Sequence, residues 1–242
     1  VDEIMEASRL PGIEIIGVYA YAYMTVKGRK TASSPREAGV SEGQQIVEVA
    51  EELRKRGLNI EIVAGGSSPT GRWVATVPGI TEVHPGGYIF NDQLSRFFGI
   101  TQKDCAASVL TTVTSKHDWR ITTDCGTKSL SCDIKESGNP GLPLDGGDGW
   151  IIDHPDLKVV SMSEEHTVIV KKDYDIEEAK KSGNYPGPGG VHTGTVTELE
   201  LGDKIRIIPN HVCPCVALYD YCYFVENDKV RKVAIPNRGK FI

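Results

Sequence analysis

Hydrophobic and polar positions follow one pattern over roughly the first hundred residues of the chain and a different one over the rest. In the first part, apolar runs predict three strands, at residues 13–20, 59–64 and 80–83. Between the first two runs, Ser41 and Gln44 form a capping-box pattern that predicts the start of a helix. Gly57 predicts the end of that helix. Strands that alternate with helices indicate a parallel sheet.

The second part of the chain carries short runs of strand-forming residues separated by turns. These runs predict a β domain with strands at residues 106–114, 120–123, 158–162, 167–170, 196–201, 204–208, 216–225 and 229–235. Residues 171–190 hold several charges and end in NYPGPGG, which is typical of an exposed loop. We therefore expect two domains, at residues 1–98 and 99–242.

A helical pattern is already under way at the first residue of the chain, since Ile4, Met5 and Leu10 mark one face of a helix. The alternation of strands and helices then stops after three strands, which are too few to close a barrel. Both features suggest that the parallel sheet is cut in half. We therefore expect the true start of the protein to lie upstream of Val1, although a tag-cleaved or processed start explains the same opening.

Composition and charge indicate which classes of binding partner the protein does not have. The 242 residues carry a formal net charge of −6 and no run rich in Lys or Arg, which argues against nucleic acid and anionic membranes. No apolar run approaches the roughly 18 residues of a membrane span. The six cysteines form no CxxC pair, and a chain of this length does not depend on disulfides for its core. We therefore expect a cytoplasmic protein with reduced thiols.

Two glycine-rich turns follow the second and third predicted strands. The first, GGSSPT at residues 65–70, opens a short predicted helix, and its glycines and hydroxyls suit a bound phosphate. An ordinary helix start, with Ser67 or Ser68 as the cap, explains the same residues without a ligand. The second turn, HPGGY at residues 84–88, lies at the carboxyl end of its strand, where sheets of this kind place their sites. Together the turns favour a phosphate more than either one alone, although both also fit ordinary strand-to-helix turns.

A third motif, PNHVCPC at residues 209–215, combines imidazole and thiol groups. In an extended chain His211, Cys213 and Cys215 point to one face, because side chains alternate along a strand. Imidazole and thiolate suit zinc, and a site with few protein ligands keeps positions open for water or substrate. A buried thiol beside a hydrogen-bonded histidine is the simpler interpretation of these residues by themselves.

Two further segments contain groups that suit acid–base or nucleophilic chemistry. SEEHT at residues 163–167 places two carboxylates beside a histidine, which fits proton transfer but equally fits a solvated turn. Lys128 could form a Schiff base if its pKa were lowered. Its polar neighbours favour a surface or hydrogen-bonded lysine instead. The sequence contains no nucleophile elbow, Walker loop or dinucleotide fingerprint.

These motifs also occur together, in one order, in a known family. GVYAYAY, GGSSPT, TEVHPGGYIFND, DCGTKSLSCD, SEEHT and GDKIRIIPNHVCPCVALYD resemble the D-serine dehydratase and D-threonine aldolase family, from about Gly17 to the end of the chain. Those proteins are fold-type III pyridoxal-phosphate enzymes and relatives of alanine racemase. The resemblance implies α/β plus β architecture: the second half of a (β/α)8 barrel at residues 1–98, followed by a β domain at 99–242.

The resemblance also assigns site residues. It implies that pyridoxal phosphate is bound by Tyr19, Gly66, Ser67, Ser68, Thr70, Gly86 and Tyr88. It implies that His211 and Cys213 bind a divalent metal, with zinc as the expected ion. The catalytic lysine of the family lies on the first barrel strand, inside a basic motif that nothing in this chain matches. The catalytic residue is therefore left unknown.

The implied activity is that of a lyase acting on β-hydroxy D-amino acids by β-elimination, with the cofactor as electron sink and zinc on the leaving hydroxyl. The His-x-Cys form of the metal pair implies dehydration of D-serine to pyruvate and ammonia. Retro-aldol cleavage of D-threonine to glycine and an aldehyde is one alternative, and a catalytically incomplete fragment or binding protein is another. The expected partners are a small D-amino acid and a second copy of the chain in a homodimer.

Overall fold

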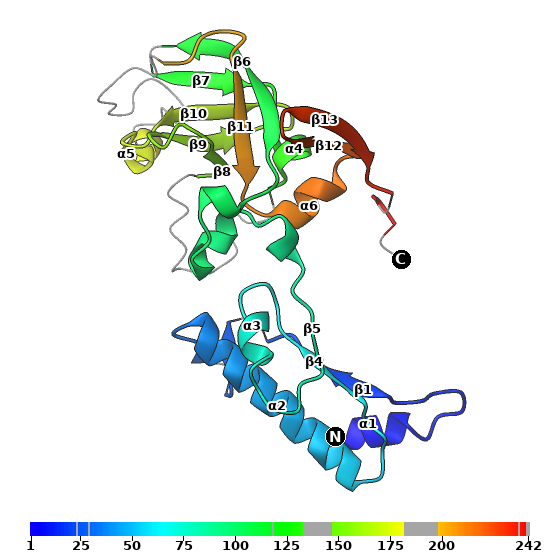
Figure 1. Cartoon of the computed structure of the whole chain (residues 1–242). Helices are drawn as coiled ribbons and strands as arrows, with labels where there is room; N and C mark the ends of the chain where they lie inside the picture. The colour runs from blue at the N-terminus through cyan, green and yellow to red at the C-terminus, as the bar shows by residue number, and fades with distance from the viewer. Residues whose placement is uncertain are drawn as a thin grey trace. The chain divides into compact units, whose positions relative to one another are not determined.

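The computed structural model describes residues 1–22, 24–28, 30–117, 119–132, 147–181, 198–236 and 238–240. It divides the chain into two compact units, Val1–Ile89 and Phe90–Ile242, which are labelled by element in Figure 1. Residues 90–98, expected in the first domain, belong to the second unit, because the Leu94 N–H donates to the carbonyl of Asn210 at 3.2 Å. The interpretation of the first unit as a half-barrel stays a prediction.

The first unit contains the predicted parallel sheet. Its strands are β1 (Gly17–Tyr19), β4 (Ile62–Gly65) and β5 (Glu82–Val83), paired in parallel in the order β1-β4-β5. All three expected strands are confirmed, although each is shorter than its apolar run. A small antiparallel pair, β2 (Thr25–Val26) with β3 (Lys30–Thr31), follows β1.

The main helix of this unit, α2 (Pro35–Lys55), covers the sheet. Its expected start at Ser41 was wrong: Ser34 is the N-cap, and its hydroxyl accepts the Glu37 N–H at 3.1 Å. Proline at the first helical position strengthens this earlier start, because its fixed φ suits a helix and its missing N–H is not needed there. The expected end is confirmed, since Gly57 follows the helix with a φ of +93°. The apolar face of α2 packs into a core of Val18, Ile46, Ala50, Leu53, Ile60 and Val63.

The second unit is built on an antiparallel sheet of six strands. They are β6 (Val109–His117), β7 (Arg120–Thr123), β8 (Gly149–Ile151), β9 (Leu157–Met162), β10 (Thr167–Lys171) and β11 (Lys204–Pro209). Their order is β8-β11-β6-β7-β10-β9. The end strands also meet, because Gly147 forms a bridge to Val159 and the Asp148 N–H donates to the Val159 carbonyl at 3.1 Å. The sheet is thus partly closed on itself.

The inner face of this sheet holds the larger hydrophobic core, formed by Val113, Ile121, Cys125, Leu130, Ile151, Leu157, Val159, Ile169, Leu199, Ile205 and Ile207. Leu199 belongs to a segment expected to be a strand, but residues 198–201 form none. A turn takes its place, since the Glu200 N–H donates to the Asp203 carboxylate at 2.7 Å. Residues 196–197 lie outside the described part of the chain.

The remaining elements are short. They are α1 (Asp2–Ala7), α3 (Gly71–Val74), η1 (Gly87–Ile89), η2 (Gln93–Phe98), η3 (Gln102–Asp104), α4 (Thr127–Leu130), α5 (Ile176–Lys181), α6 (Val212–Ala217), β12 (Tyr221–Glu226) and β13 (Lys229–Ala234). The helix α5 lies within the loop expected at residues 171–190, of which residues 182–190 are outside the described range. The strand expected at 216–225 was wrong in its first half, because α6 continues to Ala217.

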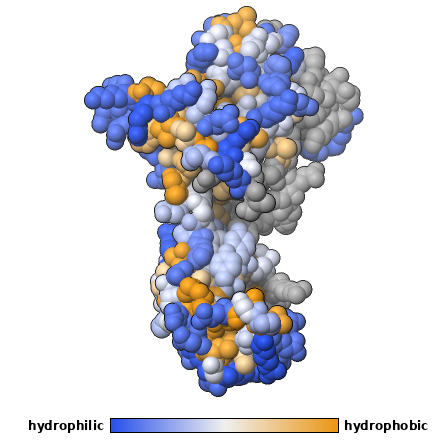
Figure 2. All heavy atoms as spheres, turned by 90° about the vertical axis from the view of Figure 1, so that its right-hand side faces the viewer, coloured by the Kyte–Doolittle hydropathy of each residue, from blue (hydrophilic) through white to orange (hydrophobic). Residues whose placement is uncertain are grey.

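Both units carry hydrophobic side chains at their surfaces (Figure 2). In the second unit these include Tyr223, Phe224 and Val225 of the β12–β13 hairpin, which is exposed along nearly its whole length. Among the described helices, none is both long enough and apolar enough to cross a membrane.

Candidate functional site

The first glycine turn begins where β4 ends and is shaped by Gly66. This residue has a φ of +88°, which side-chain-bearing residues rarely adopt. A Cβ at Gly66 would also lie 2.8 Å from the Cα of Gly71, so the chain has no room for a side chain there. The turn then leads directly into α3. Glycine is therefore required at this position by the fold alone, with or without a ligand.

A buried carboxylate from α2 holds this turn in place. Glu42 is only 1% exposed. One of its oxygens accepts the Gly66 N–H at 2.9 Å and the Ala22 N–H at 3.3 Å, and the other accepts the hydroxyl of Thr70 at 3.2 Å. Three donors thus compensate one buried charge. Glu42 was not predicted as a site residue from the sequence, although a carboxylate four residues before Ile46, on the apolar face of a helix, is an unusual placement.

Ser67 and Thr70 are joined to each other inside the turn. The Ser67 N–H donates to the Thr70 hydroxyl oxygen at 3.0 Å, and the two hydroxyl oxygens lie 2.8 Å apart. Both side chains are buried, at 3% and 0% exposure. These bonds fix the conformation of the turn from within.

Ser68 points outward and links the first turn to the second. Its side chain is exposed, and its hydroxyl accepts the Gly87 N–H at 2.8 Å. Gly86, beside this bond, is exposed, and a Cβ there would meet nothing within 4 Å. Tyr88 in η1 is also exposed. Of the predicted cofactor residues, the structure therefore brings those of the GGSSPT turn together with Gly86 and Tyr88.

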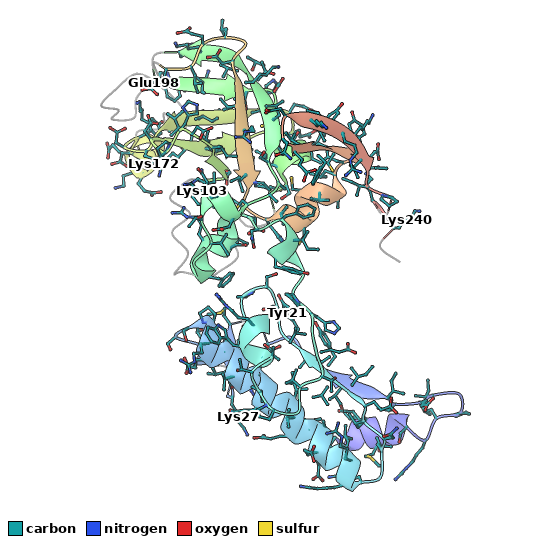
Figure 3. All side chains as sticks on the ribbon, viewed as in Figure 1. Tyr21, Lys27, Lys103, Lys172, Glu198 and Lys240 are labelled. Carbon is teal, nitrogen blue, oxygen red and sulfur yellow. The ribbon has the colours of Figure 1, made fainter. Side chains whose placement is uncertain are left out.

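An exposed pair of rings lies on neighbouring elements of the same unit. Tyr19, at the end of β1, is 57% exposed, and its ring centroid lies 5.1 Å from that of His84 at an interplanar angle of 45°. The backbone of His84 is fixed by a hydrogen bond, because its peptide N–H donates to the Gly65 carbonyl at 3.0 Å. Tyr21, labelled in Figure 3, follows β1 and is exposed as well. The first unit therefore contains both exposed aromatic rings and the hydroxyl groups of the first turn.

The predicted metal pair lies at the start of α6 in the second unit. His211 is the N-cap in extended backbone, and Cys213 is already helical. The expected extended chain through Cys215 was therefore wrong. Residues two apart on a helix do not face each other, so Cys215 points away from Cys213. Its thiol is buried, donates to the Ser129 carbonyl at 3.1 Å, and has its pKa raised to about 12 by burial.

Asp92 fixes the backbone that carries this pair. It is buried at 5% exposure, and one carboxylate oxygen accepts the Val212 N–H at 3.0 Å. The other oxygen accepts the N–H and hydroxyl of Ser95 at 3.0 and 2.8 Å. Next to these residues, the amide of Gln93 and the side-chain oxygen of Asn210 are buried without a hydrogen-bond partner among the described residues. Buried polar groups without a protein partner usually bind an ordered water or a ligand.

The His211 and Cys213 side chains have the donor chemistry that zinc prefers. Within the described ranges, no group of three or more His, Cys, Asp or Glu residues is arranged to hold a metal. The described residues therefore offer a pair of protein ligands at most, and such a site would leave positions open.

Lys128 is an ion-paired surface lysine. Its amine contacts the carboxylates of Glu164 at 2.7 Å and Glu165 at 2.9 Å. These hydrogen bonds raise its pKa well above the ordinary value, so the amine stays protonated at neutral pH and is a poor nucleophile. This agrees with the simpler interpretation of both Lys128 and the SEEHT segment.

Residues 106–225 match the family model described as "Putative serine dehydratase domain". The D-threo-3-hydroxyaspartate dehydratase of Delftia sp. (strain HT23) is 30% identical over 176 residues, which cover 69% of this chain and 41% of that protein. The D-serine dehydratase of Dictyostelium discoideum is 24% identical over 222 residues, 88% of this chain and 51% of that protein. The chain belongs to the D-serine dehydratase and D-threonine aldolase family of fold-type III pyridoxal-phosphate enzymes. It spans about half the length of the curated relatives it matches.

Solved structures support the same family. The Delftia dehydratase has a TM-score of 0.71 at 26% identity, over 90% of this chain and 55% of that one. A mutant of that dehydratase has been solved in a metal-free form, also with a TM-score of 0.71. An alanine racemase-like protein from Idiomarina loihiensis has a TM-score of 0.71 at 22% identity, which bears on the fold alone. The fold of the chain is thus similar to that of an alanine racemase-like protein.

Proposed function

We propose that the chain forms part of a lyase that uses pyridoxal phosphate and a divalent metal, with zinc as the expected ion, to dehydrate a β-hydroxy D-amino acid, D-serine first. The observation that carries this proposal is the Ser68–Gly87 hydrogen bond, which joins the two glycine turns into one surface. The dehydratases among its relatives support the reaction class.

The residues of the first unit suit the cofactor. An anion can approach Gly86 freely, and the peptide N–H groups of Ser68 and Gly86 have no acceptor among the described residues. The exposed ring of Tyr19 offers a surface for an aromatic ring, and the exposed Tyr88 is the last residue of the second turn. We therefore assign the phosphate to the turns that contain Gly66, Ser67, Ser68, Thr70, Gly86 and Tyr88. When bound, pyridoxal phosphate supplies an electron sink for the bond broken at the substrate Cα.

The second unit would contribute the metal. His211 and Cys213 supply imidazole and thiolate from a backbone that Asp92 holds. The side-chain oxygen of Asn210, which has no hydrogen-bond partner among the described residues, belongs to the residue before His211. A zinc ion held there would supply Lewis-acid polarisation of an oxygen ligand. The solved metal-free form of a relative is consistent with a metal in that protein.

The metal assignment is tested by titrating zinc into the chelator-treated chain, followed by calorimetry. We expect one site, and we expect His211→Ala and Cys213→Ser each to lower zinc affinity by about tenfold or more, because each removes one protein ligand. Cys222→Ser is the matched control, since that thiol is equally exposed but lies in β12. Equal zinc binding by all four proteins would refute the assignment.

The reaction is tested by incubating the protein with cofactor and metal and identifying the products from D-serine and D-threonine. A keto acid with ammonia would support the dehydratase. Glycine with an aldehyde would indicate the aldolase instead. Ligand binding without turnover would favour a catalytically incomplete fragment or binding protein. The homodimer and the cytoplasmic location stay predictions, and light scattering on the purified protein measures the first.

A further inference from the structure

The first turn contains three hydroxyl groups, and their hydrogen-bond partners show which of them has a proton to give to an anion. Each hydroxyl has a single proton and two acceptor positions. The three belong to Ser67, Ser68 and Thr70, all of which the proposed function places at the cofactor phosphate. The inference that the three hydroxyls have different roles at the phosphate rests on that proposed function.

The Thr70 proton is directed to Glu42. A carboxylate can only accept hydrogen bonds, so the 3.2 Å contact between the Thr70 hydroxyl and Glu42 requires Thr70 to donate. The Thr70 oxygen meanwhile accepts the Ser67 N–H at 3.0 Å. Thr70 therefore has no proton left for a ligand.

The Ser67 proton is directed to Thr70 for the same reason. The two hydroxyl oxygens lie 2.8 Å apart, which is a hydrogen bond in which one of them must donate. Since the Thr70 proton points to Glu42, the donor is Ser67. Glu42 thus orients a chain of two buried hydroxyls, and neither faces outward with a proton.

Ser68 differs from both. Its oxygen accepts the Gly87 N–H at 2.8 Å, but its own proton has no acceptor among the described residues, and its side chain is exposed. We propose that Glu42 is a positioning residue that turns the Ser67 and Thr70 protons inward, and that Ser68 is the one hydroxyl of this turn that donates to the cofactor phosphate.

The test compares the neighbouring variants Ser67→Ala and Ser68→Ala in the whole chain. The probe is pyridoxine 5′-phosphate, which has no aldehyde and so cannot react with lysines, and binding is measured by calorimetry. Pyridoxine without the phosphate serves as the reference ligand. We expect Ser68→Ala to weaken binding of the phosphate ester about tenfold, as for a lost hydrogen bond to a charged group. We expect Ser67→Ala to lose no more than about threefold, with pyridoxine binding unchanged in both.

A third variant tests the role of Glu42. In Glu42→Gln the side-chain amide donates to the Thr70 oxygen, so the Thr70 proton turns to Ser67 and the Ser67 proton is released. We therefore expect Ser67→Ala to weaken binding of the phosphate ester more in the Glu42→Gln background than in the parent. A purely structural role for Glu42 predicts the same effect of Ser67→Ala in both backgrounds.

Each outcome decides between these possibilities. Equal losses for Ser67→Ala and Ser68→Ala would overturn the division of roles and leave the proposed function standing. No binding of pyridoxine 5′-phosphate by the parent chain would overturn both. If Ser68→Ala proves unfolded by circular dichroism, Ser68→Gly decides instead, since it also removes the hydroxyl and should weaken binding of the phosphate ester about tenfold.

Discussion

The two units solve the problem of burying a sheet in different ways. In the first unit the parallel strands end at β1 and β5, and each of these has only one neighbour in the described sheet. A pocket of about 410 Å³ opens along β1, and Tyr19, which lines it, is 57% exposed. Ile13 and Ile16, which precede β1 in the chain, are about half exposed. In the second unit the end strands meet at Gly147 and Val159 and enclose a larger core. The candidate phosphate turn therefore belongs to the first unit, whose sheet is open at both edges within the described residues.

This difference predicts that damage to each sheet stays within its own unit. Hydrogen–deuterium exchange measured by mass spectrometry can resolve the two units separately, because it reports local opening segment by segment. We expect the largest loss of stability where closure of the second sheet is blocked. We expect the smallest loss where a single exposed carboxylate loses its charge.

Gly147→Val should have the largest effect, because it blocks closure of the second sheet. A Cβ at Gly147 would lie 1.7 Å from the Val159 carbonyl oxygen, and the φ of Gly147 is +69°. We expect a loss of about 3 kcal/mol or more in the free energy of unfolding, measured in urea. Gly202→Ala is the control: its φ is +91° but a Cβ there meets nothing, so the strain alone should cost about 1 kcal/mol.

Leu53→Ala should destabilise the first unit by about 2–4 kcal/mol, because this fully buried side chain fills the core between α2 and the sheet. Faster exchange should appear in α2 and β4 and leave β6 and β11 unchanged. Ile207→Ala is the counterpart in the second unit, where the reverse pattern is expected. If either variant speeds exchange in both units equally, the cores are not independent.

Asp92→Ala should cost about 1–3 kcal/mol, since it leaves the N–H groups of Val212 and Ser95 without their buried acceptor. We also expect weaker zinc binding, because the start of α6 would no longer be fixed. Asp92→Asn keeps an acceptor oxygen and should retain part of both properties. Unchanged zinc affinity in a destabilised Asp92→Ala protein would show that Asp92 supports the fold and not the metal pair.

Asp124→Asn should have the smallest effect, which is present at neutral pH and disappears in acid. Burial works to raise the pKa of Asp124, but hydrogen bonds from the Thr111 hydroxyl and the Thr112 N–H outweigh it and lower the pKa. A lowered folded-state pKa stabilises the protein above the unfolded value of about 3.9, and this contribution is lost as the pH falls through the folded value. Thermal melts between pH 5 and pH 2 should therefore fall less steeply for the variant than for the parent.

Much of the strand pattern could be predicted from the sequence, because alternation and apolar runs record directly which residues face a core. β7 was predicted at its observed bounds, Arg120–Thr123. Helix starts were less accessible: Ser34 with Pro35 outcompetes the capping box at Ser41, and both are plausible locally. The order of strands and the meeting of Gly147 with Val159 depend on contacts between distant segments, which a local pattern does not contain.

The candidate site shows the same division. The glycine turns were visible because glycine and hydroxyl residues cluster in the chain. Glu42 was not, because its partners lie 20 to 28 residues away and a lone glutamate in a helix is usually solvated. The register of the PNHVCPC segment was misjudged for a related reason: the buried Asp92, 120 residues earlier, caps Val212 and so favours a helix where the alternation of side chains suggested a strand.

The bridge between Gly147 and Val159 also bears on how the protein behaves in a crowded solution. An unpaired strand edge presents N–H and C=O groups to which a strand of another chain can add, and this is a common route to aggregation. Where β8 and β9 approach each other, backbone groups of the neighbouring residues bond within the molecule and are withheld from other chains. A substitution at Gly147 would therefore do more than destabilise the second unit. It would also expose unpaired backbone groups at the edges of both β8 and β9, to which strands of other chains could add.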